Sequence, residues 1–257
     1  MYANPYQEIG EGYARHRRPD SRIADRIEQA LGPATTVLNV GAGAGSYEPR
    51  TRRVTAVEPS TVMLRQRPPG SAPAVQGYAE CLPFADKSFD AAMAILTVHH
   101  WTDAAAGLAE LGRVADRQVV LTWEPAVTNR FWLIAEYLPQ IAEADAGLVS
   151  LGTVRALLER DGATVTVEQV PIPHDCTDGF LGAYWQRPHR YLDPRVRAAI
   201  SALANLDQEV VERAMGRLDA DLATGRWHEE HGSLLDVGTL DIGYRLVVAE
   251  RPRAVSR

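Results

Sequence analysis

The chain has 257 residues, with 27 Lys and Arg against 33 Asp and Glu, two Cys, and 46% hydrophobic residues. This length suits one large domain or two small ones with a substantial buried core. The formal net charge of -6 argues against non-specific binding to DNA or RNA, and two cysteines are too few for a disulfide framework, so we expect a reducing cytoplasm.

The N-terminal part of the chain alternates between helix-like and strand-like segments. In chain order, the expected elements are a helix at 20–31, strands at 36–40 and 54–57, a short helix after Ser60, strands at 74–76 and 89–96, a helix at 103–114, a strand at 118–123, a helix at 153–160 and a strand at 163–170. None of these apolar runs approaches the roughly 20 residues of a membrane-spanning helix. Strands that alternate with helices predict parallel β-α-β units in an open α/β sheet.

The alternation stops between Pro171 and Thr239. This stretch holds helix candidates at 194–206 and 207–222 but no strand candidate, and 240–250 is typical of a last strand. An insertion at this point can cover a crevice at the carboxyl edge of the sheet.

We therefore expect a single domain over residues 1–257. In this interpretation 1–170 and 240–250 form the α/β core, and 171–239 is a helical substrate cap inserted before the last strand. A second, separate helical domain is the alternative.

A glycine-rich loop follows the first expected strand, in the sequence VLNVGAGAG that ends at Gly45. Glycines at such a turn let a ligand touch the backbone directly. Glu58, at the end of the next strand, can accept hydrogen bonds from a ribose diol. The GxGxG spacing differs from the GxGxxG of pyrophosphate-binding loops, which disfavours a nicotinamide dehydrogenase.

Four sequence segments follow one another along the N-terminal half of the chain: VLNVGAGAGSYE, AVEPS, GYAECLPFADKSFDAAMAIL and TVHHW. Together they resemble the successive motifs of class I S-adenosylmethionine-dependent methyltransferases, in particular the group related to the ubiquinone and menaquinone biosynthesis methyltransferases. The resemblance extends from about Tyr13 to Trp123. It implies a Rossmann-like, seven-stranded, mostly parallel sheet with helices on both faces, an antiparallel last strand, and S-adenosyl-L-methionine as cofactor.

The resemblance also implies a cofactor site built from several segments. To the methionine moiety and its loop it assigns Gly41, Ala42, Gly43 and Gly45, and to the ribose Glu58. To the adenine it assigns Pro59, Ser60, Met63, Ala79 and Glu80. To the amino acid portion it assigns Thr97, together with Tyr13 and Arg18 from an N-terminal lid.

His99 and His100 follow a buried strand, at the edge where α/β sheets place their ligands. Because imidazole titrates near neutrality, it suits a general base, and we take His100 as the catalytic candidate. His99 and Trp101 are candidate acceptor contacts. Two alternatives stay open: the histidines only pack and shape the pocket, or no base is needed because alignment of the reacting atoms supplies most of the acceleration.

The segment AYWQRPHRYLD in the expected cap supplies three further candidate acceptor contacts, Tyr184, Trp185 and His189. The sequence HEEH at 228–231 does not match the HExxH metal pattern, so no metal is expected.

These features predict methyl transfer to a small-molecule acceptor by in-line displacement. The alternatives are an RNA or protein methyltransferase, and a protein of the same fold that binds the cofactor without methyl transfer, cyclase-like or regulatory. No nucleic acid or membrane partner is expected, and the oligomeric state stays open.

Overall fold

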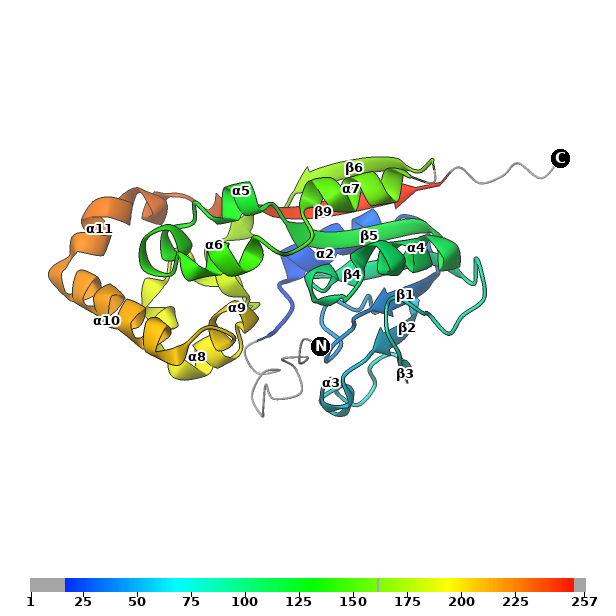
Figure 1. Cartoon of the computed structure of the whole chain (residues 1–257), viewed down its shortest axis with the longest axis horizontal. Helices are drawn as coiled ribbons and strands as arrows, with labels where there is room; N and C mark the ends of the chain where they lie inside the picture. Colours follow the sequence, from blue (N-terminus) through cyan, green and yellow to red (C-terminus); the bar gives the residue numbers. More distant parts are fainter. Residues whose placement is uncertain (1–16, 161, 252–257) are drawn as a thin grey trace.

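A computed structural model of the chain describes residues 17–160 and 162–251. Its centre is a seven-stranded sheet in the order β3-β2-β1-β4-β5-β9-β6 (Figure 1). Neighbouring strands run parallel except at β9, which is antiparallel to both β5 and β6. The sheet confirms the expected Rossmann-like fold with an antiparallel last strand.

The elements of this α/β core lie close to their expected positions. The strands are β1 (Thr36–Val40), β2 (Arg53–Glu58), β3 (Ala74–Gln76), β4 (Phe89–Ile95), β5 (Ala115–Trp123), β6 (Thr164–Gln169) and β9 (Tyr244–Glu250). The accompanying helices are α2 (Ser21–Ala30), α3 (Thr61–Arg65), α4 (Ala104–Val114) and α7 (Leu151–Glu159), with the single 3-10 turn η2 (Val98–His100) after β4. Asp20, Ser60 and Asp103 each accept a backbone hydrogen bond as N-caps of α2, α3 and α4.

Helices cover both faces of the sheet, and alternate residues of β4 show this most directly. Ala91 and Met93 belong to the hydrophobic cluster that contains α2, whereas Ala92 and Ala94 belong to the cluster that contains α4 and α7. Because successive side chains of a strand point to opposite faces, a strand covered on both sides is continuously apolar.

A helical cap stands beyond the carboxyl ends of β5 and β6, at the left of Figure 1. We use this name for two segments, 124–150 and 171–240. The first contains α5 (Pro125–Thr128), the π-helical turn η3 (Leu133–Tyr137) and α6 (Gln140–Asp145). The second contains η4 (Leu181–Tyr184), η5 (Pro188–Leu192), α8 (Pro194–Ala198), α9 (Ser201–Ala204), α10 (Gln208–Thr224), α11 (Arg226–His231) and η6 (Gly232–Asp236).

The cap departs from the expected layout in three ways. Residues 124–150, expected in the core, pack with the second segment: the Trp132 indole N–H donates to the Trp185 carbonyl at 2.9 Å. The stretch expected to lack strands begins with β7 (Ile172–Pro173) and ends with β8 (Thr239–Leu240), which pair with each other. The helix expected at 194–206 is divided into α8 and α9.

Aromatic side chains explain why the two cap segments form one body. Trp132 makes edge contacts with Tyr191 and Trp227, at ring centroid distances of 5.7 and 5.4 Å. Tyr191, Trp227 and Trp185 are fully buried. Their cluster is continuous with the core beneath α2, so the cap and the α/β core share one hydrophobic interior.

Candidate active site

The loop after β1 has a backbone that only glycine adopts readily. Gly41, Gly43 and Gly45 have φ values of +69, +52 and +95°. The amides of Gly41 and Ala42 donate to the carbonyl of Val57 at 2.8 and 3.0 Å, which fixes the loop to the end of β2. The loop therefore presents backbone, with little side chain, to the space between β1 and β4.

Glu58 lies behind this loop, with 5% of its surface exposed. Its carboxylate accepts hydrogen bonds from the amides of Gly43 and Ser60, each at 2.8 Å. Burial raises the pKa of Glu58, and the two backbone donors and Arg67 oppose that shift. A carboxylate offers about four acceptor positions, and these two amides occupy two of them.

A first pocket, of about 70 Å³, opens between the ends of β1 and β4. Five residues expected at the cofactor line it, namely Gly41, Ala42, Gly43, Met63 and Thr97. Two of its other residues, Tyr47 and Leu96, have left-handed φ values of 60° and 53° although neither is glycine. Such backbone strain persists where the surrounding structure enforces it, and it is concentrated at functional sites.

The other expected cofactor residues lie near the loop without lining this pocket. Ser60 Oγ accepts from the amide of Met63 as the cap of α3. Glu80 accepts from the amides of Thr102 and Asp103 before α4, at 2.8 and 3.2 Å. The rest of this set are buried Glu58 behind the loop, Gly45, which faces Arg67, half-buried Pro59 and buried Ala79. Their contacts with the adenine side of the ligand stay a prediction.

Of the two arginines in the expected N-terminal lid that the structure describes, Arg17 lines the pocket and the expected Arg18 does not. Arg18 is exposed and does not line the pocket, whereas Arg17 does, and Tyr13 lies outside the described residues. The Arg17 Nε donates to the carboxylate of Asp178 at 2.7 Å, and the Tyr47 hydroxyl donates to the same carboxylate at 3.0 Å. This buried network joins the lid, the glycine loop and the cap.

A second and larger pocket, of about 240 Å³, lies between the sheet edge and the cap. Both cap segments contribute to it, the first through Ile141, Ala144, Asp145 and Leu148, the second through Phe180, Leu181, Ile200, Ser201, Ala202, Asn205 and Leu206. Trp123, Thr128 and Tyr244 complete its wall with His99. The two pockets share Arg17, Leu96 and His100, so these residues mark the junction between them.

His99 and His100 lie side by side at this junction, with ring centroids 3.7 Å apart, and the ring of His99 lies 4.4 Å from that of Trp123. Although part of the His100 side chain is open to the pockets, its pKa is lowered to about 4, because the surrounding protein desolvates the cation and the charge of Arg17 repels it. Burial lowers the pKa of His99 well below its usual value. Both imidazoles are neutral at physiological pH.

We expect the His100 imidazole to stay neutral from about pH 8 down to about pH 5, since its lowered pKa is about 4. The measurement is a proton NMR titration of the His100 Cε1–H resonance, assigned by comparison with His100→Gln. Free imidazole in the same sample serves as the reference that does titrate. A His100 midpoint near 6.5, the value of an unperturbed histidine, would contradict the placement of this ring.

Four expected acceptor contacts lie elsewhere than in the larger pocket. Trp101 packs on α4, where a Cβ on Gly107 would lie 2.4 Å from its ring. Trp185 is fully buried and donates to the carbonyls of Ile172 and Pro173, at 3.0 and 3.3 Å. Tyr184 is buried in the cap core, and His189 is exposed. The aromatic character of this segment reflects packing of the cap, which corrects the expectation of a pocket wall.

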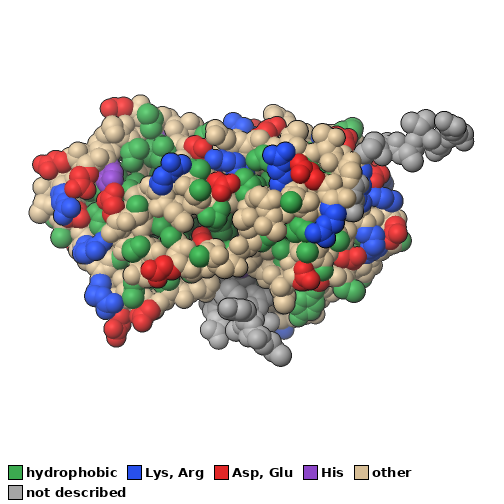
Figure 2. Space-filling view, turned by 45° about the horizontal axis from the view of Figure 1, so that its top comes forward, with side chains coloured by type: hydrophobic (Ala, Val, Ile, Leu, Met, Phe, Trp, Pro, Cys, Tyr) green, Lys and Arg blue, Asp and Glu red, His purple; other side chains and the backbone are tan. Residues whose placement is uncertain are grey.

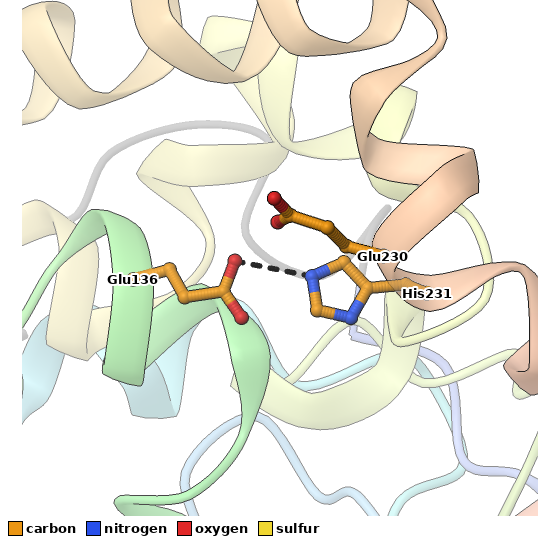
Figure 3. Close-up of side chains that lie close together, drawn as sticks. All are labelled: Glu136, Glu230 and His231. Carbon is orange, nitrogen blue, oxygen red and sulfur yellow. Dashed lines mark hydrogen bonds and ion pairs between the residues drawn. The ribbon is translucent and has the colours of Figure 1, made fainter.

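One group of possible metal ligands occurs among residues 17–160 and 162–251, on the cap surface (Figure 3). It consists of Glu136, Glu230 and His231, whose ligand atoms lie within 4.8 Å of one another. The His231 Nε2 lies 3.1 Å from the Glu136 carboxylate, and Arg226 donates to Glu230 at 3.0 Å. The acidic groups therefore already have protein partners, and the cluster does not line either pocket.

Comparison with known proteins agrees with this geometry. Residues 38–121 match a family model described as a methyltransferase domain. A crystal structure from Anabaena variabilis, described as a methyltransferase from an antibiotic biosynthesis pathway, is 33% identical, with a TM-score of 0.86 over 92% of this chain and 99% of that chain. A 39-residue segment is 51% identical to the uncharacterized protein YafE of Escherichia coli, and it spans 15% of this chain and 19% of that protein.

More distant structures share the fold alone. Geranyl diphosphate C-methyltransferase from Streptomyces coelicolor is 16% identical, with a TM-score of 0.52 over 90% of this chain and 80% of that chain. The [4+2]-cyclase SpnF is 17% identical, with a TM-score of 0.51 over 91% of this chain and 82% of that chain. No helix in the described part of the chain has the length and apolarity to cross a membrane. The glycine loop, the carboxylate behind it and the full-length similarity place this chain in the class I S-adenosylmethionine-dependent methyltransferases.

Proposed function

We propose that the protein transfers a methyl group to a small-molecule acceptor held in the larger pocket. The observation that supports this most directly is the junction of the two pockets, where Arg17, Leu96 and His100 line both. A donor seated against the glycine loop and an acceptor seated under the cap would meet there. The larger pocket is closed by protein on several sides, which suits a small molecule better than a polymer.

The residues of the loop fit the donor. When bound, S-adenosylmethionine supplies an electrophilic methyl carbon attached to a sulfonium sulfur. Gly41 and Gly43 line the pocket that would take its methionine portion, and the Arg17 guanidinium in the same wall would face its carboxylate. Glu58 lies behind the loop, and the acceptor positions that its two backbone bonds leave would hold the ribose diol. Thr97 lies against the loop, where a Cβ on Gly41 would be 2.1 Å from its hydroxyl oxygen.

On the acceptor side, the protein holds the nucleophilic atom in line with the methyl carbon and excludes water. Correct alignment of two reactants supplies a large part of the acceleration of such a reaction. We assign to His100 the role of general base: an unprotonated ring nitrogen would accept the proton that the acceptor loses as its bond to the methyl carbon forms, while the bond from that carbon to sulfur breaks and its electron pair stays on the sulfur. The lowered pKa keeps this nitrogen unprotonated at neutral pH.

Methyl-labelled S-adenosylmethionine tests the acceptor class. The protein is incubated with the small-molecule, RNA and protein fractions of a cell extract, and we expect label in the small-molecule fraction. Label in bulk tRNA or in protein would overturn the proposal. Tight binding of the cofactor by calorimetry, with no label in any fraction, would favour a protein of this fold that transfers no methyl group.

Replacing Glu58 with glutamine is expected to weaken S-adenosylmethionine binding by roughly 1.5–3 kcal/mol, as for the loss of a charge-assisted hydrogen bond. Glutamine keeps the shape of the side chain but has only one acceptor oxygen, so it retains one of the two loop bonds of Glu58, whereas an alanine variant loses both. Calorimetric titration gives the affinity, and Asp86→Asn, an exposed carboxylate, is the control. Equal affinity of Glu58→Gln and wild type would contradict the ribose assignment.

The distribution of surface charge bears on whether the protein binds nucleic acid. On the face shown in Figure 2, Lys and Arg side chains are interspersed with Asp and Glu, which does not resemble the basic stripe of a nucleic-acid-binding protein.

Cys81 and Cys176 are both free thiols, as is usual in a reducing compartment, and we retain the cytoplasm as the proposed location.

A further inference from the structure

The larger pocket is apolar over most of its wall. Its apolar side chains include Leu96, Ile141, Leu148, Phe180, Ile200 and Leu206. An engineered protein cavity of about 150 Å³ with a similar lining holds one benzene molecule. The pocket here measures about 240 Å³, so it suits a compound of one or two rings.

A single carboxylate, that of Asp145, belongs to the described wall of this pocket. Asp145 is the last residue of α6, and it is half-buried. Trp123 lines the same pocket, and its side chain interacts with this carboxylate and opposes the rise of its pKa. Trp123 also contacts His99, at a ring centroid distance of 4.4 Å, so Asp145 is connected to the junction of the two pockets through one indole ring.

The charges around this carboxylate decide what the pocket accepts. Among residues 17–160 and 162–251, Asp145 forms no ion pair, whereas Arg17 is bound to Asp178. The other titratable groups in the described wall are His99, His100 and Tyr244. Burial holds both histidines neutral and raises the pKa of the Tyr244 hydroxyl, so this phenol also stays uncharged near neutrality.

We propose that Asp145 selects the acceptor: a one- or two-ring apolar molecule whose O–H or N–H group donates a hydrogen bond to this carboxylate, with anionic analogues excluded. The inference rests on the proposed function of the pocket as the acceptor site. A buried carboxylate gains from a donor and repels a second negative charge, and this repulsion is what gives discrimination. A diphosphate or carboxylate group would place two negative charges together in an apolar enclosure.

Three matched probes test the selection: 2-naphthol carries a donor, 2-methylnaphthalene carries none, and 2-naphthoate carries a negative charge. Their affinities for the full chain, saturated with S-adenosylhomocysteine, are measured by calorimetry. We expect 2-naphthol to bind best and 2-naphthoate to bind worst. In Asp145→Asn, 2-naphthol should lose about tenfold in affinity, 2-naphthoate should gain, and 2-methylnaphthalene should not change. Glu143→Gln, an exposed carboxylate of the same helix, is the control and should match wild type.

The pH dependence distinguishes recognition by the carboxylate from a change in shape. Burial raises the pKa of Asp145 to about 6, so its carboxylate is protonated as pH falls below that value. Binding of 2-naphthol to wild type should weaken between about pH 7 and about pH 5, and binding to Asp145→Asn should stay constant. His99, His100, Tyr244 and the Arg17 guanidinium do not change charge in this interval.

The outcomes separate this inference from the proposed function. If S-adenosylhomocysteine fails to bind wild type, the proposed donor site is wrong. If S-adenosylhomocysteine binds but Asp145→Asn leaves the order of the three probes and their pH profiles unchanged, the selection by Asp145 is wrong. Failure of all three probes to bind the loaded wild-type protein would overturn the ring-sized acceptor.

Discussion

Replacing Asp178 with alanine is expected to lower the free energy of unfolding by about 3–5 kcal/mol, the usual cost of removing one partner of a buried ion pair. Asp178 is fully buried, and the Arg17 side chain bound to it is 12% exposed. The variant therefore leaves a guanidinium without its anion in a place that water hardly reaches. It also removes the acceptor of the Tyr47 hydroxyl, whose pKa is raised by burial and by Asp178, so this group stays a donor.

Urea denaturation followed by circular dichroism measures this loss. Asp175→Ala is the matched control: this neighbouring aspartate also pairs with an arginine, Arg22, but its side chain is 58% exposed. An exposed pair contributes about 0–1 kcal/mol, so the control should unfold nearly as wild type does. If the two variants lose the same stability, the network of lid, loop and cap does not form as described.

Replacing Gly41 with alanine is expected to lower the free energy of unfolding by about 2–5 kcal/mol and to weaken cofactor binding by at least about tenfold. Two effects add. The φ of +69° costs an L-residue about 1–2 kcal/mol, and a Cβ would lie 2.1 Å from the Thr97 hydroxyl oxygen, too close for any contact. The loop must shift away from β4, and the pocket for the methionine portion shifts with it.

A second glycine separates the two effects. Gly70 also has a left-handed backbone, with φ of +83°, but a Cβ there would meet nothing within 4 Å. Gly70→Ala therefore measures the backbone term alone, and the difference from Gly41→Ala measures the steric term. Thermal denaturation gives both stabilities, and calorimetry with S-adenosylmethionine gives the affinities. Gly41→Ala with wild-type affinity would show that the loop does not contact the donor.

The donor half of the molecule was predictable because its signals are local. A strand, a glycine turn and a carboxylate at the end of the next strand lie within about 20 residues of one another, and in the structure the amide of Gly43 donates to Glu58. The apolar run of β4 was equally clear, because a strand covered on both faces needs no alternation.

The lid shows where local reasoning fails. Arg17 and Arg18 are adjacent, and adjacent side chains of an extended segment point in opposite directions. Which arginine faces the pocket depends on the pairing of Arg17 with Asp178, a residue 161 positions away. No signal within the basic segment reveals that partner.

The cap shows a second kind of failure. Its first segment consists of short helical turns, with Pro125 at the start of α5 and Pro139 before α6, so its sequence shows no long amphipathic period. That segment nevertheless supplies Asp145 to the larger pocket. Trp185 was expected at the pocket and does not line it. Its aromatic, proline-rich sequence surroundings suit a pocket wall and a packed core equally well, and only its complete burial decides between the two.

Each cap segment begins at the carboxyl end of a strand, the first after β5 and the second after β6. These two strand ends lie at the edge of the sheet where β9 begins, because β5 and β6 both run antiparallel to β9. The glycine loop follows β1 and Glu58 ends β2, and both strands lie outside the two cap segments. Exchange of both segments between homologous genes would change most of the wall of the larger pocket. Asp178 of the second segment, however, binds Arg17 and Tyr47 of the first pocket, so an exchanged segment must keep this carboxylate.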